Sequence, residues 1–386
     1  MSPVNQELEK ARLELAALCD VALLSSLPNV TYVSGFEVPH AVGVSAAIPY
    51  APPFAVFAVR DTPSWLAVSG FGVGQAKRES RLDHLLTFDA LDSFNPTDVR
   101  GTFFEAARRA LHEAGLSEHG TLGVESRALP YGLAEFITDT FPNVKLVEID
   151  DALERARLTK TPREIELLRR AIEIGDVGQN TLRELAQTPG RNEFDMYAEI
   201  IARMQRAAGH EIPVAGELVS GPRTTTVNYP GGPQDRVTQT GDPVLMDISQ
   251  RVSGYWSDVT NAYVVGAEPN AHQLKFARAS QAAFEAAVNA LRPGVRASDV
   301  WTAANAAYEK HGIPMPHYIG HQLGVTVNEL PRIVPYDHTP IQANMVFALE
   351  PGAYEGPGGT IGVRSEKNVL VTANGAEIIS KFDWGI

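Results

Sequence analysis

The alternation of apolar and polar positions along the chain predicts two regions of different architecture. Up to about residue 150, short apolar runs such as FAVFAV (54–59) and SWLAVS (64–69) alternate with amphipathic segments at about 5–18 and 102–114. Apolar runs of this length, separated by helical segments, are typical of an α/β layer. We therefore expect residues 1–153 to form a first domain of α/β type.

A strong helix start marks the beginning of a second domain. Thr161 is placed to cap a helix, Pro162 occupies its first position, and Glu164 can complete a capping box. Helices are predicted at about 162–187, 192–209, 268–291 and 297–312, with strand-rich blocks at 213–266 and 316–381. This order predicts an α+β domain, residues 154–386, in which two similar halves close around a shared site.

One segment of the second domain places two acids among residues that favour strands. In PVLMDISQRVSGYWSDVT (243–260), a hairpin with its turn at Arg251–Gly254 would pair Asp247 directly with Asp258, with Cβ atoms roughly 4.5–5.5 Å apart. Two buried carboxylates at this spacing repel each other. They are tolerated if they share a proton, if a basic side chain intervenes or if a cation binds. Alternatively, one aspartate is a solvent-facing edge residue.

Three further residues favour the cation. His321 lies between glycines in IGHQLGV, Glu350 ends the apolar run of MVFALEPGAY, and Glu366 lies in GVRSEKNVLVT. We expect the two glutamates to face each other across the glycine-rich loop that separates them. Four carboxylates and one imidazole suit two divalent metal ions, and the oxygen-rich ligand set favours Mn²⁺, with Co²⁺, Zn²⁺ or Fe²⁺ as alternatives.

Composition and charge narrow the classes of function. The chain has 386 residues, of which 44% are hydrophobic, and a formal net charge of −13 without a basic run. Nucleic acid and anionic membranes are therefore not expected as partners. Cys19 is the single cysteine, which fits a reducing compartment. Because neither a secretory signal nor an apolar run of ~18 residues is evident, we expect a cytoplasmic protein.

From about residue 155 onward, the sequence resembles the pita-bread metallohydrolases, the family of prolidase, aminopeptidase P, methionine aminopeptidase and creatinase. The motifs that carry the resemblance are the eleven-residue spacing of the two aspartates, GH-x-x-G (320–324), EPG (350–352) and R-x-E-x-N-V (364–369). The resemblance implies a pita-bread catalytic domain preceded by a smaller creatinase-type α/β domain. In that first domain, LPNVTYVSGF (27–36) is expected to form a strand and a turn.

The resemblance also implies how the metal ions are held. Asp247 would bind one ion, and His321 with Glu350 would bind the other. Asp258 and Glu366 would bridge both ions. A metal-bridging hydroxide would attack the scissile carbonyl, and Glu350 is expected to pass a proton from that water to the leaving nitrogen.

Other residues match the family's substrate pocket. His317 is expected to take part in catalysis, and Tyr354 is expected to contact the substrate. Two roles are open for Arg364: its guanidinium can bind a carboxylate of the substrate, or it can pair with one of the carboxylates that bind metal. The resemblance further implies short peptides as substrates and a homodimer as the assembly.

The sequence departs from the family pattern at several positions. Asn228 and Asn328 stand where the family's peptidases usually carry histidines that donate hydrogen bonds to the substrate carbonyl and to the tetrahedral intermediate. We expect both asparagines to bind substrate, although an amide cannot carry a proton or a positive charge. Asn261 and Lys367 replace an arginine and an aspartate that are commoner in the family.

The leading hypothesis is therefore a dimetal peptidase of the Xaa-Pro dipeptidase or aminopeptidase P type. One alternative is a dimetal hydrolase of the same fold with another specificity: a non-proline exopeptidase, such as a carboxypeptidase, or an amidohydrolase of small metabolites. Another is a non-catalytic binding protein. The retained metal ligands argue against this last alternative, because a scaffold has no need for four buried acids.

Overall fold

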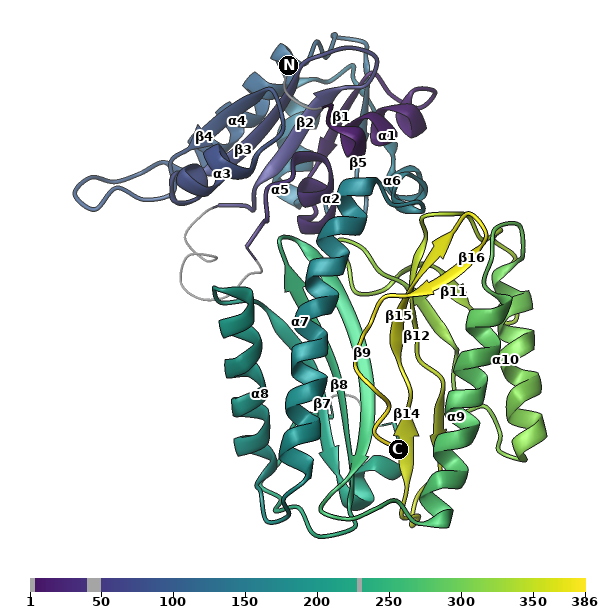
Figure 1. Ribbon diagram of the computed structural model, residues 1–386. Helices are drawn as coiled ribbons and strands as arrows, with labels where there is room; N and C mark the ends of the chain where they lie inside the picture. Colours follow the sequence, from purple (N-terminus) through teal and green to yellow (C-terminus); the bar gives the residue numbers. More distant parts are fainter. Residues whose placement is uncertain (1–3, 40–49, 228–230) are drawn as a thin grey trace. The chain divides into compact units, whose positions relative to one another are not determined.

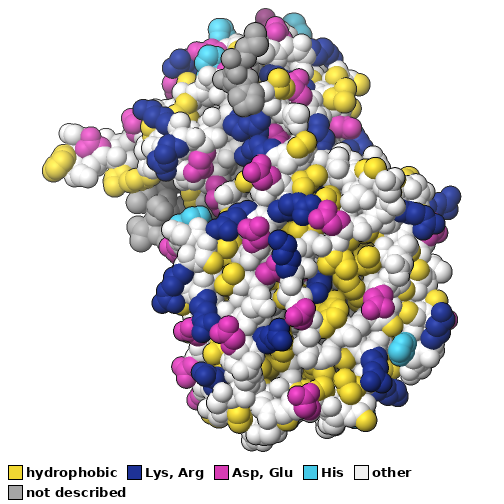
Figure 2. Space-filling model, viewed as in Figure 1, with side chains coloured by type: hydrophobic (Ala, Val, Ile, Leu, Met, Phe, Trp, Pro, Cys, Tyr) yellow, Lys and Arg dark blue, Asp and Glu magenta, His cyan; other side chains and the backbone are white. Residues whose placement is uncertain are grey.

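The computed structural model describes residues 4–39, 50–227 and 231–386. Contacts divide the chain into two compact units, Met1–Arg157 and Leu158–Ile386. The boundary predicted after residue 153 lies within helix α6 (Asp150–Arg157). Among the described residues, no helix is both long enough and apolar enough to cross a membrane. Figure 2 shows basic and acidic side chains interspersed over the viewed surface.

The first unit is an α/β layer, as the sequence predicts. Its six-stranded sheet has the order β4-β3-β2-β1-β5-β6, with both parallel and antiparallel neighbours. The strands are β1 (Val21–Leu24), β2 (Phe54–Ala58), β3 (Ser64–Ser69), β4 (His84–Phe88), β5 (Thr121–Val124) and β6 (Lys145–Glu148). The other helices are α1 (Gln6–Leu15), α2 (Leu27–Ser34), α3 (Val73–Glu79), α4 (Val99–Glu113) and α5 (Tyr131–Thr140).

One prediction for this unit is wrong: most of residues 27–36 form helix α2 and not a strand and turn. The Ser26 hydroxyl accepts a hydrogen bond from the Asn29 amide (3.2 Å), Pro28 lies in the first turn, and Gly35 ends the helix with φ 72°. The β-branched residues of the segment favour strands. The capping residues at both ends nevertheless determine the local structure, because they satisfy the terminal backbone groups of a helix.

The second unit has the predicted order of two helices, strands, two helices and strands. Its first half contains α7 (Pro162–Ala186), α8 (Glu193–Ala208), β7 (Val214–Ser220), β8 (Pro243–Val252) and β9 (Tyr255–Val264). Its second half contains α9 (Ala271–Ala290), α10 (Ala297–His311), β10 (Gly320–Gln322), β11 (Glu329–Ile333), β12 (Val346–Leu349), β13 (Gly352–Tyr354), β14 (Gly362–Arg364), β15 (Lys367–Thr372) and β16 (Gly375–Ile378). The predicted capping box at the start of α7 is confirmed.

Each half of this unit has its own apolar core between helices and strands. In the first half, Leu182 and Met204 from the helices pack with Ile248 of the sheet β7-β8-β9. In the second half, Ala283 of α9 belongs to one cluster with Phe347 of the sheet β11-β10-β12-β15-β16. The four helices therefore lie outside the strands (Figure 1), and the opposite strand faces are left to form the interior.

The two halves join where β9 approaches β15. The Glu366 amide, just before β15, donates to the Thr260 carbonyl (3.0 Å). The Asn368 side-chain amide donates to the Asp258 carbonyl (2.6 Å). These bonds align residues from distant parts of the sequence, and both involve a predicted metal ligand or its neighbour.

Candidate metal centre

The β8-β9 hairpin does not have the register predicted from the sequence. Its turn is Ser253-Gly254, both with positive φ (50° and 85°), which is the backbone of a tight two-residue turn. Asp247 therefore pairs with Thr260, and Asp258 pairs with Ser249. The prediction assumed a four-residue turn, so its strand pairing differs from the observed pairing by two positions. Because side chains alternate with period two, the shift leaves both aspartates on one face of the sheet, as diagonal neighbours.

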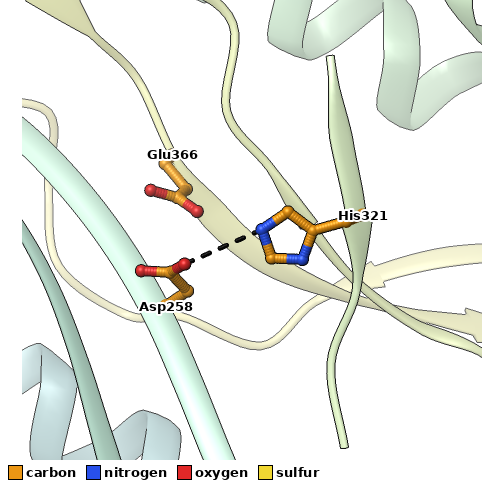
Figure 3. Close-up of side chains that lie close together, drawn as sticks. All are labelled: Asp258, His321 and Glu366. Carbon is orange, nitrogen blue, oxygen red and sulfur yellow. Dashed lines mark ion pairs between the residues drawn. The ribbon is translucent and has the colours of Figure 1, made fainter. Parts of the chain in front are cut away.

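Asp258, His321 and Glu366 form the centre of the site. Each offers a ligand atom, and these atoms lie within 4.8 Å of one another; the three side chains point toward a common point in Figure 3. His321 Nε2 lies 3.7 Å from Asp258 Oδ2 and 3.4 Å from Glu350 Oε1. Its Nδ1 lies 3.0 Å from the Gln322 carbonyl, which can only accept a hydrogen bond. Nε2 therefore faces the acids with a free lone pair.

The register of two ladders places Glu350 opposite Glu366. Leu349 pairs with Lys367 at the end of the β12-β15 ladder, and Gly352 pairs with Arg364 in β13-β14. The two glutamates fill the gap between these ladders. Both are buried, and the Glu350 amide donates to the Ile319 carbonyl (2.7 Å).

The acids are only partly satisfied by hydrogen bonds. The Ser249 hydroxyl donates to Asp258 Oδ1 (2.9 Å), and the Thr260 hydroxyl donates to Glu366 Oε2 (2.5 Å). Within the described residues, Asp247 Oδ1 and Glu366 Oε1 are buried without a hydrogen-bond partner. Buried carboxylate oxygens without donors are costly. Oxygen ligands of this kind, together with an available imidazole nitrogen, fit divalent cations.

Arg364 contacts the acids directly. Its Nη2 donates to Asp247 and to Glu217 Oε2 (3.0 Å), and its Nη1 donates to the Tyr354 hydroxyl (3.2 Å). In the structure, therefore, Arg364 pairs with a predicted metal ligand, which is one of the two roles that the sequence suggested for it. Glu217 was missed from the sequence; its signal is a lone acid at a buried position of β7 (VAGELVS).

Burial changes the protonation of the acids in the absence of metal. It raises the pKa of Asp258 and of Glu366 well above the usual carboxyl range, and neighbouring carboxylates add to the effect. Burial also raises the pKa of Glu350 to about 8, although the Arg364 charge opposes it. Burial therefore favours the protonated forms of these carboxyl groups, and a bound cation would favour their ionised forms.

The two histidines are kept neutral by the same burial. It lowers the pKa of His321, and it lowers the pKa of His317 to about 4 with help from the Arg364 charge. The His317 Nδ1 lies 2.7 Å from the Tyr318 carbonyl, and its Nε2 lies 3.4 Å from the Tyr354 hydroxyl. His317, Tyr354 and Arg364 therefore line one side of the acid cluster as a connected hydrogen-bonded group.

The two predicted substrate asparagines are placed differently. Asn228 lies outside the described residues. Asn328 is exposed, and its side-chain oxygen accepts a hydrogen bond from Arg332 Nε (3.0 Å). The Arg332 guanidinium thus lies beside the amide at this position.

Removing metal should make the stability of the protein depend on pH between about 5 and 8. The pKa of Glu350 is about 8 in the folded chain and near 4.3 when unfolded, so the folded state holds more protons in this window. Stability should therefore fall as pH rises, by roughly 1 kcal/mol per pH unit for each carboxyl still protonated. Denaturant titrations of chelator-treated protein measure this slope. Saturating Mn²⁺ should reverse the loss, and a flat profile without metal would contradict the assignment.

Comparisons with known proteins agree with this geometry. Residues 166–373 match metallopeptidase family M24, and residues 8–159 match the creatinase/prolidase N-terminal domain. The Xaa-Pro dipeptidase of Pyrococcus furiosus is 31% identical over 264 residues, which cover 68% of this chain and 74% of that protein. A probable dipeptidase of Mycobacterium tuberculosis, PepE, is 33% identical over 271 residues (64% and 70%).

A solved structure extends the similarity over the whole chain. The prolidase from Pyrococcus horikoshii has a TM-score of 0.80 and 26% identity, with 98% of this chain and 99% of that chain covered. The expected pita-bread fold and the smaller domain before it are thereby confirmed. The chain belongs to metallopeptidase family M24 and is a hydrolase of peptide bonds whose family requires divalent metal ions.

Proposed function

We propose that the chain removes residues from short peptides as an Xaa-Pro dipeptidase or aminopeptidase P type enzyme with two divalent metal ions. The observation that carries the proposal is the group of four acids and His321, all of them buried except the partly exposed Asp247. Asp247 and Glu366 each keep a buried oxygen without a hydrogen-bond partner. The names of two similar proteins, an Xaa-Pro dipeptidase and a prolidase, support the substrate class.

Five residues would hold the ions: Asp247, Asp258, His321, Glu350 and Glu366. When bound, the ions lower the pKa of an attacking water and polarise the scissile carbonyl. Mn²⁺ is the proposed metal, because four of the five ligands offer oxygen. We also propose a homodimer that acts in the cytoplasm, on the basis of the family resemblance and of a single, buried cysteine.

Glu350 is the proposed proton carrier. Glu350 Oε1 lies 3.4 Å from His321 Nε2 within the acid cluster, so its carboxylate would stand within reach of a water held by the ions. It would accept a proton as water attacks the carbonyl and deliver it to the leaving nitrogen. The nearby His321 would stay neutral throughout, since burial lowers its pKa.

The group formed by His317, Tyr354 and Arg364 would orient the substrate. His317 is neutral at working pH, with its pKa lowered to about 4, so it can accept or donate a hydrogen bond without carrying charge. The Tyr354 hydroxyl lies between His317 and Arg364, which makes it a donor that can turn toward a bound peptide. Asn228 and Asn328 are proposed to contact the peptide as amide donors.

A non-proline exopeptidase is the second candidate. Asn328 favours it, because an amide paired with Arg332 replaces the expected imidazole. A mass-spectrometric screen of di-, tri- and tetrapeptides with Mn²⁺-loaded enzyme distinguishes the two. Cleavage concentrated on Xaa-Pro bonds is expected, whereas equal cleavage of Xaa-Ala peptides would favour the second candidate.

The metal stoichiometry tests the two-ion proposal. Reconstituted protein should contain two Mn²⁺ per chain, since four acids and one imidazole make two workable shells and a single ion would leave ligands unsatisfied. Plasma emission spectroscopy gives the number directly. Asp258→Asn should lower it, because Asp258 is proposed to bridge both ions. Background metal content in wild type and variant alike would refute the site.

Replacing Glu350 by Gln should reduce kcat by about a hundredfold or more, the usual contribution of a positioned acid-base group. The amide retains one oxygen for coordination but cannot accept and release the proton. Steady-state kinetics with metal content measured on the same sample separate loss of catalysis from loss of metal. A metal-loaded variant with most of the wild-type kcat would exclude Glu350 as the proton carrier.

Asn328→His should change the preference between Xaa-Pro and Xaa-Ala peptides by about tenfold, roughly 1.4 kcal/mol of differential transition-state binding. The imidazole can hold a positive charge where the amide cannot, but it also loses the acceptor oxygen bound by Arg332. Ratios of kcat/KM over a matched peptide panel measure the shift. Unchanged ratios would show that position 328 does not set specificity.

A further inference from the structure

The tail segment, Lys381–Gly385, packs against β9, which carries Asp258, and against the start of β15, which directly follows Glu366. Along β9, Asp258 and Thr260 face the acid cluster, so Asn261 points to the opposite face of the sheet. The tail segment lies on that opposite face, where Phe382 is buried in the core of the first half. None of the proposed catalytic steps uses these residues.

The tail segment is fixed to the first half of the unit by two buried polar side chains. Asp176 of α7 accepts hydrogen bonds from the Lys381 amide with both oxygens (3.1 and 3.0 Å). Asn261 of β9 donates to the Asp383 carbonyl (2.9 Å) and accepts from the Gly385 amide (3.1 Å). Asn261 is 2% exposed, so its amide is committed to the tail segment and to neighbouring groups of β9.

The same segment is fixed to the second half through Lys367 of β15. The Lys367 ammonium donates to the Phe382 carbonyl (2.6 Å) and lies 4.2 Å from the centre of the Trp384 ring. Trp384 in turn packs edge-on against Phe284 of α9, with ring centres 5.2 Å apart. A charged donor, a cation–π contact and an aromatic pair therefore hold one short segment.

The two anchors of the tail segment, Asn261 and Lys367, lie next in the sequence to a residue that binds Glu366 and to Glu366 itself. Asn261 follows Thr260, whose carbonyl and hydroxyl both bind Glu366. Lys367 follows Glu366 itself. Displacement of either anchor would therefore move β9 relative to β15, and with it the spacing between Asp258 and Glu366.

We infer that the tail segment is a clasp that positions Asp258 and Glu366 for metal binding by tying β9 to β15. Residues that orient metal ligands without touching the metal typically contribute 10–100-fold in affinity. Asn261 and Lys367 are thus positioning residues. The inference rests on the proposed metal-binding role of the two acids.

Two variants of the full chain test the clasp. Lys367→Met removes the ammonium donor and keeps most of the apolar stem, and Asn261→Leu removes the amide without adding charge. We expect each to weaken Mn²⁺ binding by about tenfold, measured by calorimetric titration of chelator-treated protein. Loss of a positive charge would by itself strengthen binding of a cation, so weaker binding by Lys367→Met has to come from displaced ligands.

Lys381→Met is the matched control, since it removes the same charge from an exposed side chain of the same segment. Its Mn²⁺ affinity should equal that of wild type or exceed it slightly. Hydrogen exchange gives a second measurement without metal: amides of 255–264 and 365–372 should exchange about tenfold faster in both anchor variants and not in the control. If Asn261→Leu does not fold, the results for Lys367→Met alone test the clasp.

The possible results distinguish a failure of the clasp proposal from a failure of the proposed metal centre. Wild-type protein that binds no Mn²⁺ overturns the proposed metal centre and this inference together. Wild-type binding with unchanged affinity in both anchor variants overturns the clasp alone. Weaker affinity together with faster exchange in β9 and β15, and no change in Lys381→Met, supports it.

Discussion

The repulsion among buried carboxylates is the constraint on which the rest of this unit depends. Asp258, Glu350 and Glu366 are each less than 10% exposed, and burial raises the pKa of all three. Such a group would disrupt a core unless each acid is held by hydroxyls, a guanidinium, protons or cations. The surrounding apolar clusters of the two halves supply the stability that permits this concentration of acids.

The sequence predicted what depends on local pattern and on motif. The capping box at Thr161 and the helical periodicity located α7 to α10 closely, because these signals lie within a few residues. The hairpin register was missed, since a two-residue turn at Ser253-Gly254 depends on positive φ at both positions. Helix α2 was missed because the strand and turn expected there came from the family resemblance, whereas the caps at Ser26 and Gly35 define a helix.

Contacts between distant segments could not be predicted in this way. Glu217 reaches the acid cluster through Arg364, 147 positions away, and Asn261 holds residues more than 120 positions away. Asn261 and Lys367 were noted only as departures from the family. In the structure both bind the tail segment, through the carbonyls of Phe382 and Asp383.

The charge balance of the cluster links metal, protons and Arg364. Among the described residues, Arg364 contacts Asp247 and Glu217, so one guanidinium faces two acids while three more lie close by. Burial first, and the remaining negative charge second, favour protonation of these acids when metal is absent, so the pKa values of Glu350 and Glu366 are raised. Cations that enter must displace these protons, so metal affinity should increase with pH. Metal binding would also weaken the attraction between Asp247 and Arg364, because a carboxylate shared with a cation attracts a guanidinium less strongly. We propose that Arg364 would then be available to bind a substrate carboxylate, so that it pairs with Asp247 in the metal-free protein and binds substrate in the metal-loaded protein.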